Sequence, residues 1–177
     1  MTYNAITCAI RTGKGFIGTI EFFPEEGKYH FDGHKACGIC LSPEETIALN
    51  YLCPRCGKRV TIGVMHRVER LADREKGFVP KDSSTFCRVI PLPEIIAEVL
   101  NTGVNSSKVL AEYLRLLDML GNEVSILIET PLNDIELAGS HLLREAISRM
   151  RKGKVQINPV FDGKYGRVRI FGEVALH

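Results

Sequence analysis

Two Cys-x-x-Cys pairs, Cys37/Cys40 and Cys53/Cys56, lie with twelve residues between them and constrain this chain more than any other feature. Two residues between cysteines let both thiolates face one ion from a tight turn, and two such turns complete a tetrahedron around Zn²⁺. Because the protein would supply all four ligands, the predicted zinc is structural and not catalytic. The spacing therefore predicts a zinc ribbon that holds one ion, and Cys40→Ser is expected to unfold it.

Histidines close to the first pair leave a second ligand set open. His30 and His34 precede Cys37 with three residues between them, so a mixed His/Cys site is also conceivable. Cys8 and Cys87 have no partner at metal-binding spacing, and we expect them to be small buried residues.

The cysteine clustering favours a reducing compartment, where such thiols are metal ligands more often than disulfides. The first residues lack the charged start and apolar run of a signal peptide, and no stretch approaches 18 consecutive apolar residues. We therefore expect a cytoplasmic protein that does not cross a membrane.

Charge is spread unevenly along the chain. The net charge is +2, but residues 53–81 and 144–177 are basic, whereas residues 82–143 are acidic. Clustered Lys and Arg attract nucleic-acid phosphates, because neutralising them releases condensed counterions. A solvated charged surface would show the same composition, so both interpretations stay open at this point.

Local patterns predict the elements of the first half. Ser42 and Glu45 form a capping box with Pro43 at the first helical position, so a helix is expected from there to about residue 50. The other elements expected are a weak helix over 5–12, a strand over 14–23, a hairpin over 27–40 with its turn at Asp32-Gly33, a strand over 59–64, and a basic helix over 66–74.

The second half alternates helical and strand patterns after a polar loop at 77–91. We expect helices over 93–100 and 107–120, a strand over 123–129, a long helix from Asn133 to about Lys152, and two strands over 154–160 and 166–171 joined at Asp162-Gly163. Ser106 or Ser107 would cap the second helix, and Gly121 would end it. The fold class is therefore α+β, a four-cysteine zinc ribbon followed by a small mixed helix/strand domain.

The glycine-rich stretch RTGKGFIGT (11–19) does not fit a phosphate-binding loop. Such a loop needs a lysine directly after its last glycine, and Gly18 is followed by Thr19. No nucleoside triphosphate is expected as a ligand.

Five segments of the sequence resemble the endonuclease Q family. They are GTIEFFPEEGKYHFDGHKAC (18–37), CPRCGKRVTIGVMHRVERLADR (53–74), IPLPEIIAEVL (90–100), SSKVLAEYLRLLDMLGNEVSIL (106–127) and DGKYGRVRIF (162–171). Members of this family carry a polymerase-and-histidinol-phosphatase (PHP) barrel and cleave DNA beside deaminated bases, uracil and hypoxanthine among them. Related sequences are sometimes labelled ATP-dependent DNA helicase-related, but nothing in these residues supports that activity.

The resemblance implies a chain without the catalytic barrel. The barrel's metal motifs include His-x-His, and no two of the five histidines here are separated by one residue. Asp32-Gly33-His34 has the barrel's Asp-x-His pattern but lies in the segment that follows the barrel. The implied plan is a remnant of a PHP barrel strand with a linker (1–28), a four-cysteine zinc-ribbon domain (29–79) and an α+β C-terminal domain (80–177). No catalytic residue is assigned, and a PHP catalytic domain in cis or in trans is the implied partner.

A protein that recognises deaminated bases needs aromatic faces for stacking and hydrogen-bonding groups for a flipped base. The segment beside the ribbon supplies both, and the lesion-pocket candidates are Tyr29, His30, Phe31, Asp32 and His34. The alternative is that Tyr29 and Phe31 alternate into the ribbon's small core while the polar residues face water.

Contacts to the DNA backbone are expected from the basic residues. In a helix over 66–74, Arg67, Arg70 and Arg74 would share one face, which is typical of a backbone binder. The full set of candidates is Lys58, Arg59, Arg67, Arg70, Arg74, Arg151, Lys152, Lys154, Lys164 and Arg167.

The function expected is the zinc-containing, DNA-binding part of a repair endonuclease for deaminated bases. The alternative is a zinc-ribbon adaptor that docks proteins through the acidic middle, or a non-specific nucleic-acid-binding module. Strong salt dependence of binding would favour the DNA interpretation.

Overall fold

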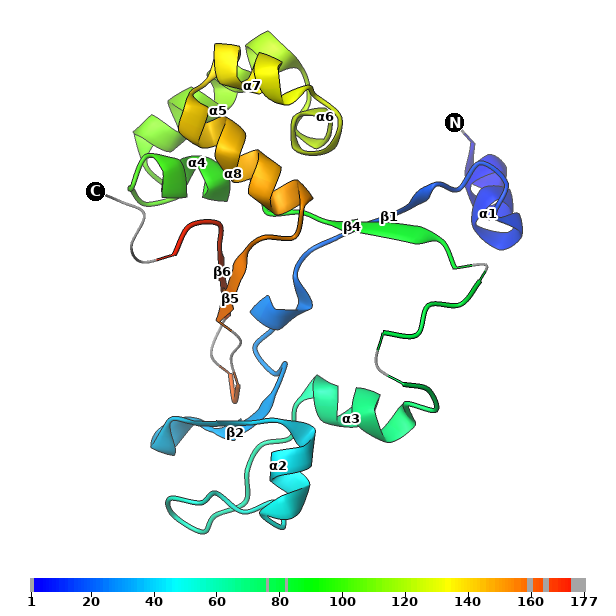
Figure 1. The fold of residues 1–177 in the computed structure, drawn as a ribbon, viewed down its shortest axis with the longest axis vertical. Helices are drawn as coiled ribbons and strands as arrows, with labels where there is room; N and C mark the ends of the chain where they lie inside the picture. Colours follow the sequence, from blue (N-terminus) through cyan, green and yellow to red (C-terminus); the bar gives the residue numbers. More distant parts are fainter. Residues whose placement is uncertain (1, 76, 82, 159–160, 164–165, 173–177) are drawn as a thin grey trace.

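The computed structural model describes residues 2–75, 77–81, 83–158, 161–163 and 166–172. Along these residues helices and short strands are mixed, which confirms the α+β class. The described chain has three parts (Figure 1): a helical body, a knuckle region that contains the two cysteine pairs, and an arm that projects beside the body. None of its helices has both the length and the apolar character needed to cross a membrane.

The helical body holds the main hydrophobic core. Its helices are α4 (Leu92–Val99), α5 (Ser107–Leu120), α6 (Glu123–Ile128), α7 (Leu132–Ala138) and α8 (His141–Arg151). Their inward faces bury Leu92, Ile95, Ile96, Leu116, Ile126, Ile135 and Ile147 almost completely. The Ser106 hydroxyl accepts from the Val109 N–H, which makes Ser106 the N-cap of α5, and Gly121 ends that helix as predicted.

Two predictions in the body were wrong. The apolar run at 123–129 is helix α6, because the Asn122 side chain caps the Ser125 N–H and the neighbouring helices bury Ile126 and Leu127. The long helix predicted from Asn133 is two helices, since the chain breaks at Gly139 and the Ser140 hydroxyl begins α8. A short apolar run does not distinguish a strand from a buried helix by its period alone.

The arm consists of α1 (Tyr3–Thr12), β1 (Gly18–Glu21) and β4 (Thr85–Arg88). β1 and β4 pair in parallel, with Gly18 opposite Thr85 and Glu21 opposite Arg88. Strand β4 lies inside the segment predicted to be a polar loop, and β1 is shorter than the strand predicted over 14–23. A short 3-10 helix, η1 (Pro24–Glu26), follows β1, and the adjacent Phe23 reaches the main core.

The knuckle region begins with a hairpin of β2 (Asp32–His34) and β3 (Ile39–Leu41). Its turn is the 3-10 helix η2 (Lys35–Cys37) with Gly38, not Asp32-Gly33 as predicted, because Asp32 and Gly33 are paired residues of β2. The capping box of Ser42 and Glu45 begins α2 (Pro43–Ala48), which confirms that prediction.

The second half of the knuckle region differs from its prediction. The strand expected over 59–64 is reduced to single bridges at Arg59 and Thr61. Helix α3 (Val64–Leu71) is shorter than predicted, because Ala72 already has an extended backbone. Arg74 therefore lies outside the helix and stacks its guanidinium 5.1 Å from the Phe78 ring centroid.

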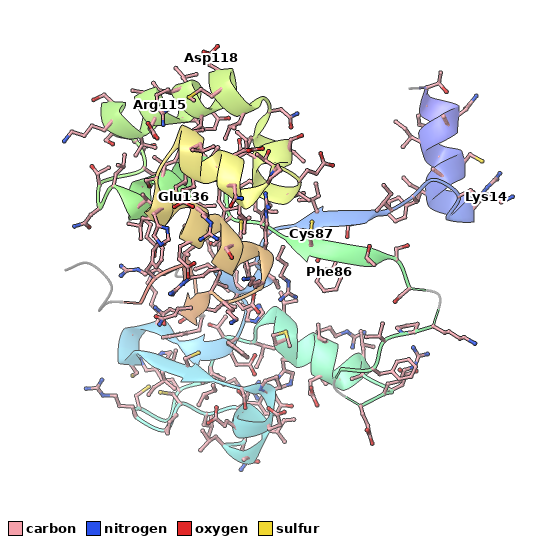
Figure 2. The ribbon with its side chains drawn as sticks, turned by 45° about the horizontal axis from the view of Figure 1, so that its top comes forward. Lys14, Phe86, Cys87, Arg115, Asp118 and Glu136 are labelled. Atoms are coloured by element: carbon pink, nitrogen blue, oxygen red, sulfur yellow. The ribbon has the colours of Figure 1, made fainter. Side chains whose placement is uncertain are left out.

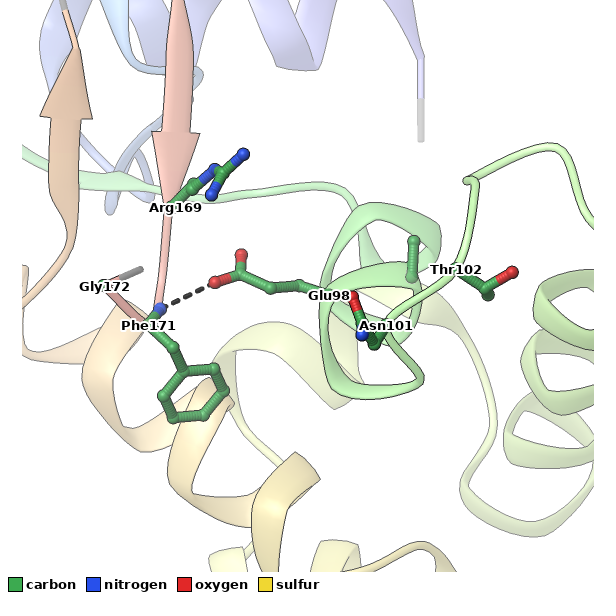
Figure 3. A pocket seen from close by; sticks show the side chains of 7 residues that line it. Glu98, Asn101, Thr102, Arg169, Phe171 and Gly172 are labelled. Atoms are coloured by element: carbon green, nitrogen blue, oxygen red, sulfur yellow. Dashed lines mark hydrogen bonds between the residues drawn. The ribbon is translucent and has the colours of Figure 1, made fainter. Parts of the chain in front are cut away.

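A C-terminal hairpin joins the helical body to the knuckle region. Strands β5 (Gln156–Asn158) and β6 (Arg167–Arg169) are antiparallel, and the predicted turn at Asp162-Gly163 is confirmed. At the base of the hairpin, the Glu98 carboxylate of α4 accepts the Ile170 and Phe171 N–H groups at 3.0 and 2.7 Å. Figure 3 shows this bond to Phe171 beside a cavity of about 310 Å³.

The tip of the same hairpin contacts the knuckle region. Asp162 accepts the Lys35 N–H at 2.6 Å through one carboxylate oxygen and the Thr61 hydroxyl at 2.7 Å through the other. Phe161 packs over Gly33, where a Cβ would overlap its ring. The C-terminal part of the chain thus packs onto the knuckle region and does not hang free of it.

Candidate metal centre and nucleic-acid interface

One group of side chains in the described part of the chain is arranged to hold a metal ion. The ligand atoms of His34, Cys37, Cys53 and Cys56 all lie within 4.8 Å of one another. His34 ends β2, Cys37 lies in η2, and Cys53 and Cys56 bracket the tight turn of the second knuckle. Gly57, with a φ of 70°, lets the backbone fold back directly after Cys56.

Cys40 is not part of this group. It lies on β3 opposite Gly33, and its side chain is exposed. The reason is the register of the hairpin: η2 places Cys37 and His34 toward the second knuckle, whereas Cys40 points elsewhere from the next strand. The structure therefore groups three of the four predicted cysteines with the histidine that the sequence left as an alternative. Cys8, which was predicted to be buried, is exposed as well, because α1 buries none of its residues.

The protonation of the thiols reflects their crowding. A hydrogen bond with Cys56, together with burial, raises the pKa of the Cys37 thiol to about 11. Burial also raises the pKa of the Cys53 thiol, but the backbone N–H groups of Arg55 and Cys56 outweigh it and lower that pKa to about 7. The Cys53 thiol thus loses its proton more readily than the Cys37 thiol, and a bound cation would displace the proton of Cys37.

The predicted lesion-pocket residues have different surroundings. Asp32 is fully buried, accepts the Gly63 N–H at 2.6 Å and lies 2.7 Å from Nδ1 of His66. His34 belongs to the metal group, and Tyr29 is half exposed. His30 is buried with its ring edge-to-face on the half-buried Phe31 at 4.7 Å.

His66 was not singled out from the sequence, yet it anchors α3. Its second ring nitrogen lies 3.5 Å from the Tyr51 hydroxyl, so Asp32, His66 and Tyr51 form a chain of polar contacts beside the metal group. Tyr51 has a positive φ of 64°, a conformation that costs energy outside glycine. No sequence pattern relates these three positions, because only the fold brings them together.

The basic candidates of the knuckle region are exposed. Lys58 and Arg59 follow Cys56, and Arg67 and Arg70 lie on α3 at positions i and i+3, so they share a helix face. Arg74 does not share that face, because the helix has already ended. Four cations on and beside α3 therefore remain available for phosphate contacts.

The basic candidates of the C-terminal part differ from one another. Arg151 is turned inward: its guanidinium donates to the carbonyl oxygens of Leu127, Ile126 and Thr130 at 2.8, 2.9 and 2.7 Å. These carbonyls lie at the end of α6 and directly after it, so Arg151 of α8 holds these two helices together. Its guanidinium is engaged inside the body, and its predicted contact with DNA stays a prediction. Arg167 lies in β6, and Lys164 lies outside the described residues.

Lys152 and Lys154 remain exposed at the end of α8. Together with Arg149, they line a cavity of about 310 Å³. Glu145 pairs with Arg149 at 2.8 Å, and this hydrogen bond lowers the pKa of the Glu145 carboxyl. Because Glu145 is paired with Arg149, Lys152 and Lys154 are the exposed cations of this cavity.

Two solved structures are similar to the whole of this chain. A crystal structure of the lesion-specific endonuclease PfuEndoQ from Pyrococcus furiosus superposes on all of this chain with a TM-score of 0.84 and 32% identity. The chain is similar in sequence and fold to the C-terminal portion of endonuclease Q. It covers 44% of that solved chain, so more than half of the endonuclease has no counterpart in these residues.

Three further matches cover all or part of the chain. A structure of endonuclease Q with a 27-mer duplex substrate, which has an abasic lesion at the active site, superposes on the whole chain with a TM-score of 0.77 and 33% identity, and the chain covers 45% of it. An uncharacterized protein of Methanocaldococcus jannaschii, MJ0043, is 31% identical over 167 residues, which are 94% of this chain and 21% of that protein. The family model named MJ0043 C-terminal domain matches residues 91–154, the helical body.

Proposed function

We propose that this chain is the zinc-containing, DNA-binding part of a DNA-repair endonuclease that acts on deaminated bases such as uracil and hypoxanthine. A PHP barrel, in cis or in trans, would carry out the hydrolysis. The observation that carries the proposal is the superposition of the whole chain on endonuclease Q, including a structure of that enzyme with a DNA duplex. A cytoplasmic location remains part of the proposal.

Zinc is the metal that best suits the ligand set. A tetrahedral ion with Zn–S and Zn–N distances of about 2.3 and 2.0 Å places neighbouring S and N ligands about 3.5 Å apart. Sγ of Cys56 and Nδ1 of His34 lie 3.5 Å apart, which agrees with this separation of ligand atoms. Three cysteines and one histidine leave no position for water, so the zinc would supply folding free energy and no hydrolytic chemistry.

Phosphate contacts are assigned to the exposed cations of two regions. Lys58, Arg59, Arg67 and Arg70 belong to the knuckle region, and Lys152 and Lys154 end the helical body. Each cation that displaces a condensed counterion steepens the dependence of affinity on salt. Among the lesion-pocket candidates, Tyr29 keeps a half-exposed ring for stacking, whereas Asp32 and His34 have the internal roles described above.

The test is binding of the zinc-loaded chain to a labelled duplex containing deoxyinosine and to the undamaged duplex, over a salt series. Tighter binding to the lesion would place base recognition in this chain. Equal but strongly salt-dependent binding would make the chain a phosphate clamp and leave specificity to the barrel. No binding to either duplex at low salt would overturn the proposal and favour the protein-adaptor alternative.

Variants make that test specific to the assigned cations. Arg67→Gln combined with Arg70→Gln is expected to weaken binding about equally for both duplexes and to reduce the salt slope by about two. Arg115→Gln is the matched control, because Arg115 lies on α5 in a surface pair with Glu112 (Figure 2). An equal loss in the control would sink the assignment to α3.

A further inference from the structure

The basic cavity at the end of α8 has features that a solvated patch of lysines lacks. It is lined by Glu145, Ser148, Arg149, Lys152 and Lys154 and has a volume of about 310 Å³. Sites for small ligands enclose about 300–1,000 Å³, so this cavity is at the lower end of that range. It has room for one small group and not for a stretch of duplex.

Ser148 is a polar residue that α8 buries in the wall of this cavity. Only 6% of its surface is exposed, and none of the hydrogen bonds among the described residues involves its hydroxyl. Buried polar side chains normally have a hydrogen-bond partner. Because Ser148 lines the cavity, a ligand bound there can supply that partner.

Arg149 is held in place beside Ser148. Its Nε donates to Glu145, one turn earlier on α8, at 2.8 Å, and its guanidinium stacks 5.0 Å from the ring centroid of Phe171. The bond to Glu145 uses Nε, which leaves the terminal guanidinium nitrogens as a fork for two oxygens of an anion. A side chain that is fixed in advance loses less conformational entropy when it binds a ligand.

Lys152 and Lys154 are not needed to cap α8. Cationic side chains often stabilise the carbonyl groups at a helix C-terminus. Here backbone N–H groups already satisfy these carbonyls: Lys152 donates to Ser148 and Arg149 at 3.2 Å each, and Lys154 donates to Arg149 at 2.8 Å. The two ammonium groups lie exposed at the cavity, where they can bind a ligand.

The charges of the cavity match a dianion. Three cationic side chains and one carboxylate line it, which leaves two net positive charges. A phosphate held by one ester bond carries a charge of about −1.5 to −2 at pH 7 and has three terminal oxygens. A phosphate inside a DNA strand carries one negative charge, and the sugars on both sides of it hinder its approach to a buried hydroxyl.

We propose that this cavity is a binding site for a phosphomonoester, the group found at a phosphorylated DNA strand end or on a free nucleotide. Arg149 binds two of its oxygens, Ser148 donates to the third, and Lys152 and Lys154 neutralise the remaining charge. A strand end as the source of the group rests on the proposed function, whereas the chemistry of the cavity does not depend on it.

The first experiment compares two labelled single-stranded oligonucleotides that differ only in carrying a 5′-phosphate or a 5′-hydroxyl group. Both are titrated with the full zinc-loaded chain, and fluorescence anisotropy gives the two affinities. We expect the phosphorylated strand to bind at least about fivefold more tightly, because hydrogen bonds to charged groups are the stronger ones.

The second experiment adds small molecules to the chain and follows its amide NMR signals. Thymidine 5′-monophosphate and inorganic phosphate are expected to shift the signals of Ser148 and Arg149, whereas thymidine is expected to leave them unchanged. A shift with the monophosphate but no preference between the two strands would assign the site to a free nucleotide.

Variants connect these results to the cavity. Arg149→Gln is expected to remove most of the strand preference, and Ser148→Ala to lower it at least about twofold, with thermal melts as the check on folding. Lys154→Gln changes an exposed side chain and should also lower the preference. Arg115→Gln is the matched control, because Arg115 pairs with Glu112 of its own helix at 2.6 Å and does not line the cavity.

Two results would overturn the phosphomonoester site: equal affinity of the two strands with no shift caused by the monophosphate, or a preference that Arg149→Gln and Lys154→Gln both leave unchanged. The proposed function is tested separately by the same samples. A chain that binds DNA without either sign of the site contradicts only the phosphomonoester proposal. A chain that binds the monophosphate but no DNA contradicts only the DNA-binding role.

Discussion

The helical body and the knuckle region are held together by different forces. The body buries a continuous core of Leu, Ile, Val and Phe side chains, whereas the buried core of the knuckle region consists of Leu41, Cys53 and Val60. Burying an aliphatic side chain contributes about 1.5–3 kcal/mol, so the first set can fold a domain and the second cannot. We therefore expect the knuckle region to depend on a metal bound at its candidate ligands and on the hairpin tip.

Removal of the metal is expected to have the largest effect, and to unfold the knuckle region but not the helical body. A structural zinc contributes on the order of 10 kcal/mol to its local fold, so a chelator or Cys37→Ser should unfold residues 32–61 while α4–α8 stay folded. Hydrogen exchange resolved along the chain would measure both regions at once. Simultaneous unfolding of the body would show that the two regions are one cooperative unit.

Cys40→Ser and His34→Ala decide which residue is the fourth ligand. The sequence predicts that Cys40→Ser unfolds the ribbon, but the structure groups His34 with the other three ligands and leaves Cys40 exposed. We therefore expect His34→Ala to lower zinc affinity strongly and Cys40→Ser to change it little. Competition with a chromophoric chelator would measure both, and the reverse order would restore the four-cysteine site.

A cavity created in the core of the helical body should destabilise the body independently of the metal. Leu116 and Ile135 are fully buried, and Leu116→Ala is expected to cost about 2–5 kcal/mol of the free energy of unfolding. The loss should be the same with and without bound metal, as thermal melts would record. A loss that depended on metal would show that the knuckle region supports the core.

The contact between the two regions is expected to be worth less. Asp162→Ala removes the acceptor for the Lys35 N–H and the Thr61 hydroxyl, at a cost of about 1–3 kcal/mol. Hydrogen exchange should become faster in the hairpin tip and in the Lys35 turn, whereas exchange in the helices should not change. Asp162→Asn keeps one acceptor and should cost less, so an equal cost would point to a charge effect.

Lowering the pH should weaken the contact of Asp162 with Lys35 and Thr61, by less than Asp162→Ala does. The Lys35 N–H, the Thr61 hydroxyl and the nearby His34 and Lys35 charges lower the pKa of the Asp162 carboxyl. The contribution is therefore present above the ordinary aspartate pKa of about 3.9 and is lost as the pH falls through the lower folded value. Stability of the chain and of Asp162→Asn, compared between pH 6 and about 3, would measure it, because metal-site protonation affects both alike.

Sequence patterns by themselves determined the parts whose cause is local. The capping box at Ser42, the cap at Ser106, the stop at Gly121 and the turn at Asp162-Gly163 follow from neighbouring residues, and each was predicted. Cys-x-x-Cys spacing predicted a metal site of Cys37, Cys40, Cys53 and Cys56, and three of these four lie together in the structure. These features involve residues a few positions apart, where the backbone geometry is fixed by the residue types.

Only the tertiary structure decided the rest. The grouping of His34, and not Cys40, with the other three cysteines depends on the register of a three-residue strand pair, because neighbouring residues of a strand point to opposite faces. The inward turn of Arg151 and the pairing of Asp162 with Lys35 join residues far apart in the chain, at positions that share no periodicity. Helix α6 replaced a predicted strand for the same reason: its apolar residues obtained their conformation from the helices that bury them.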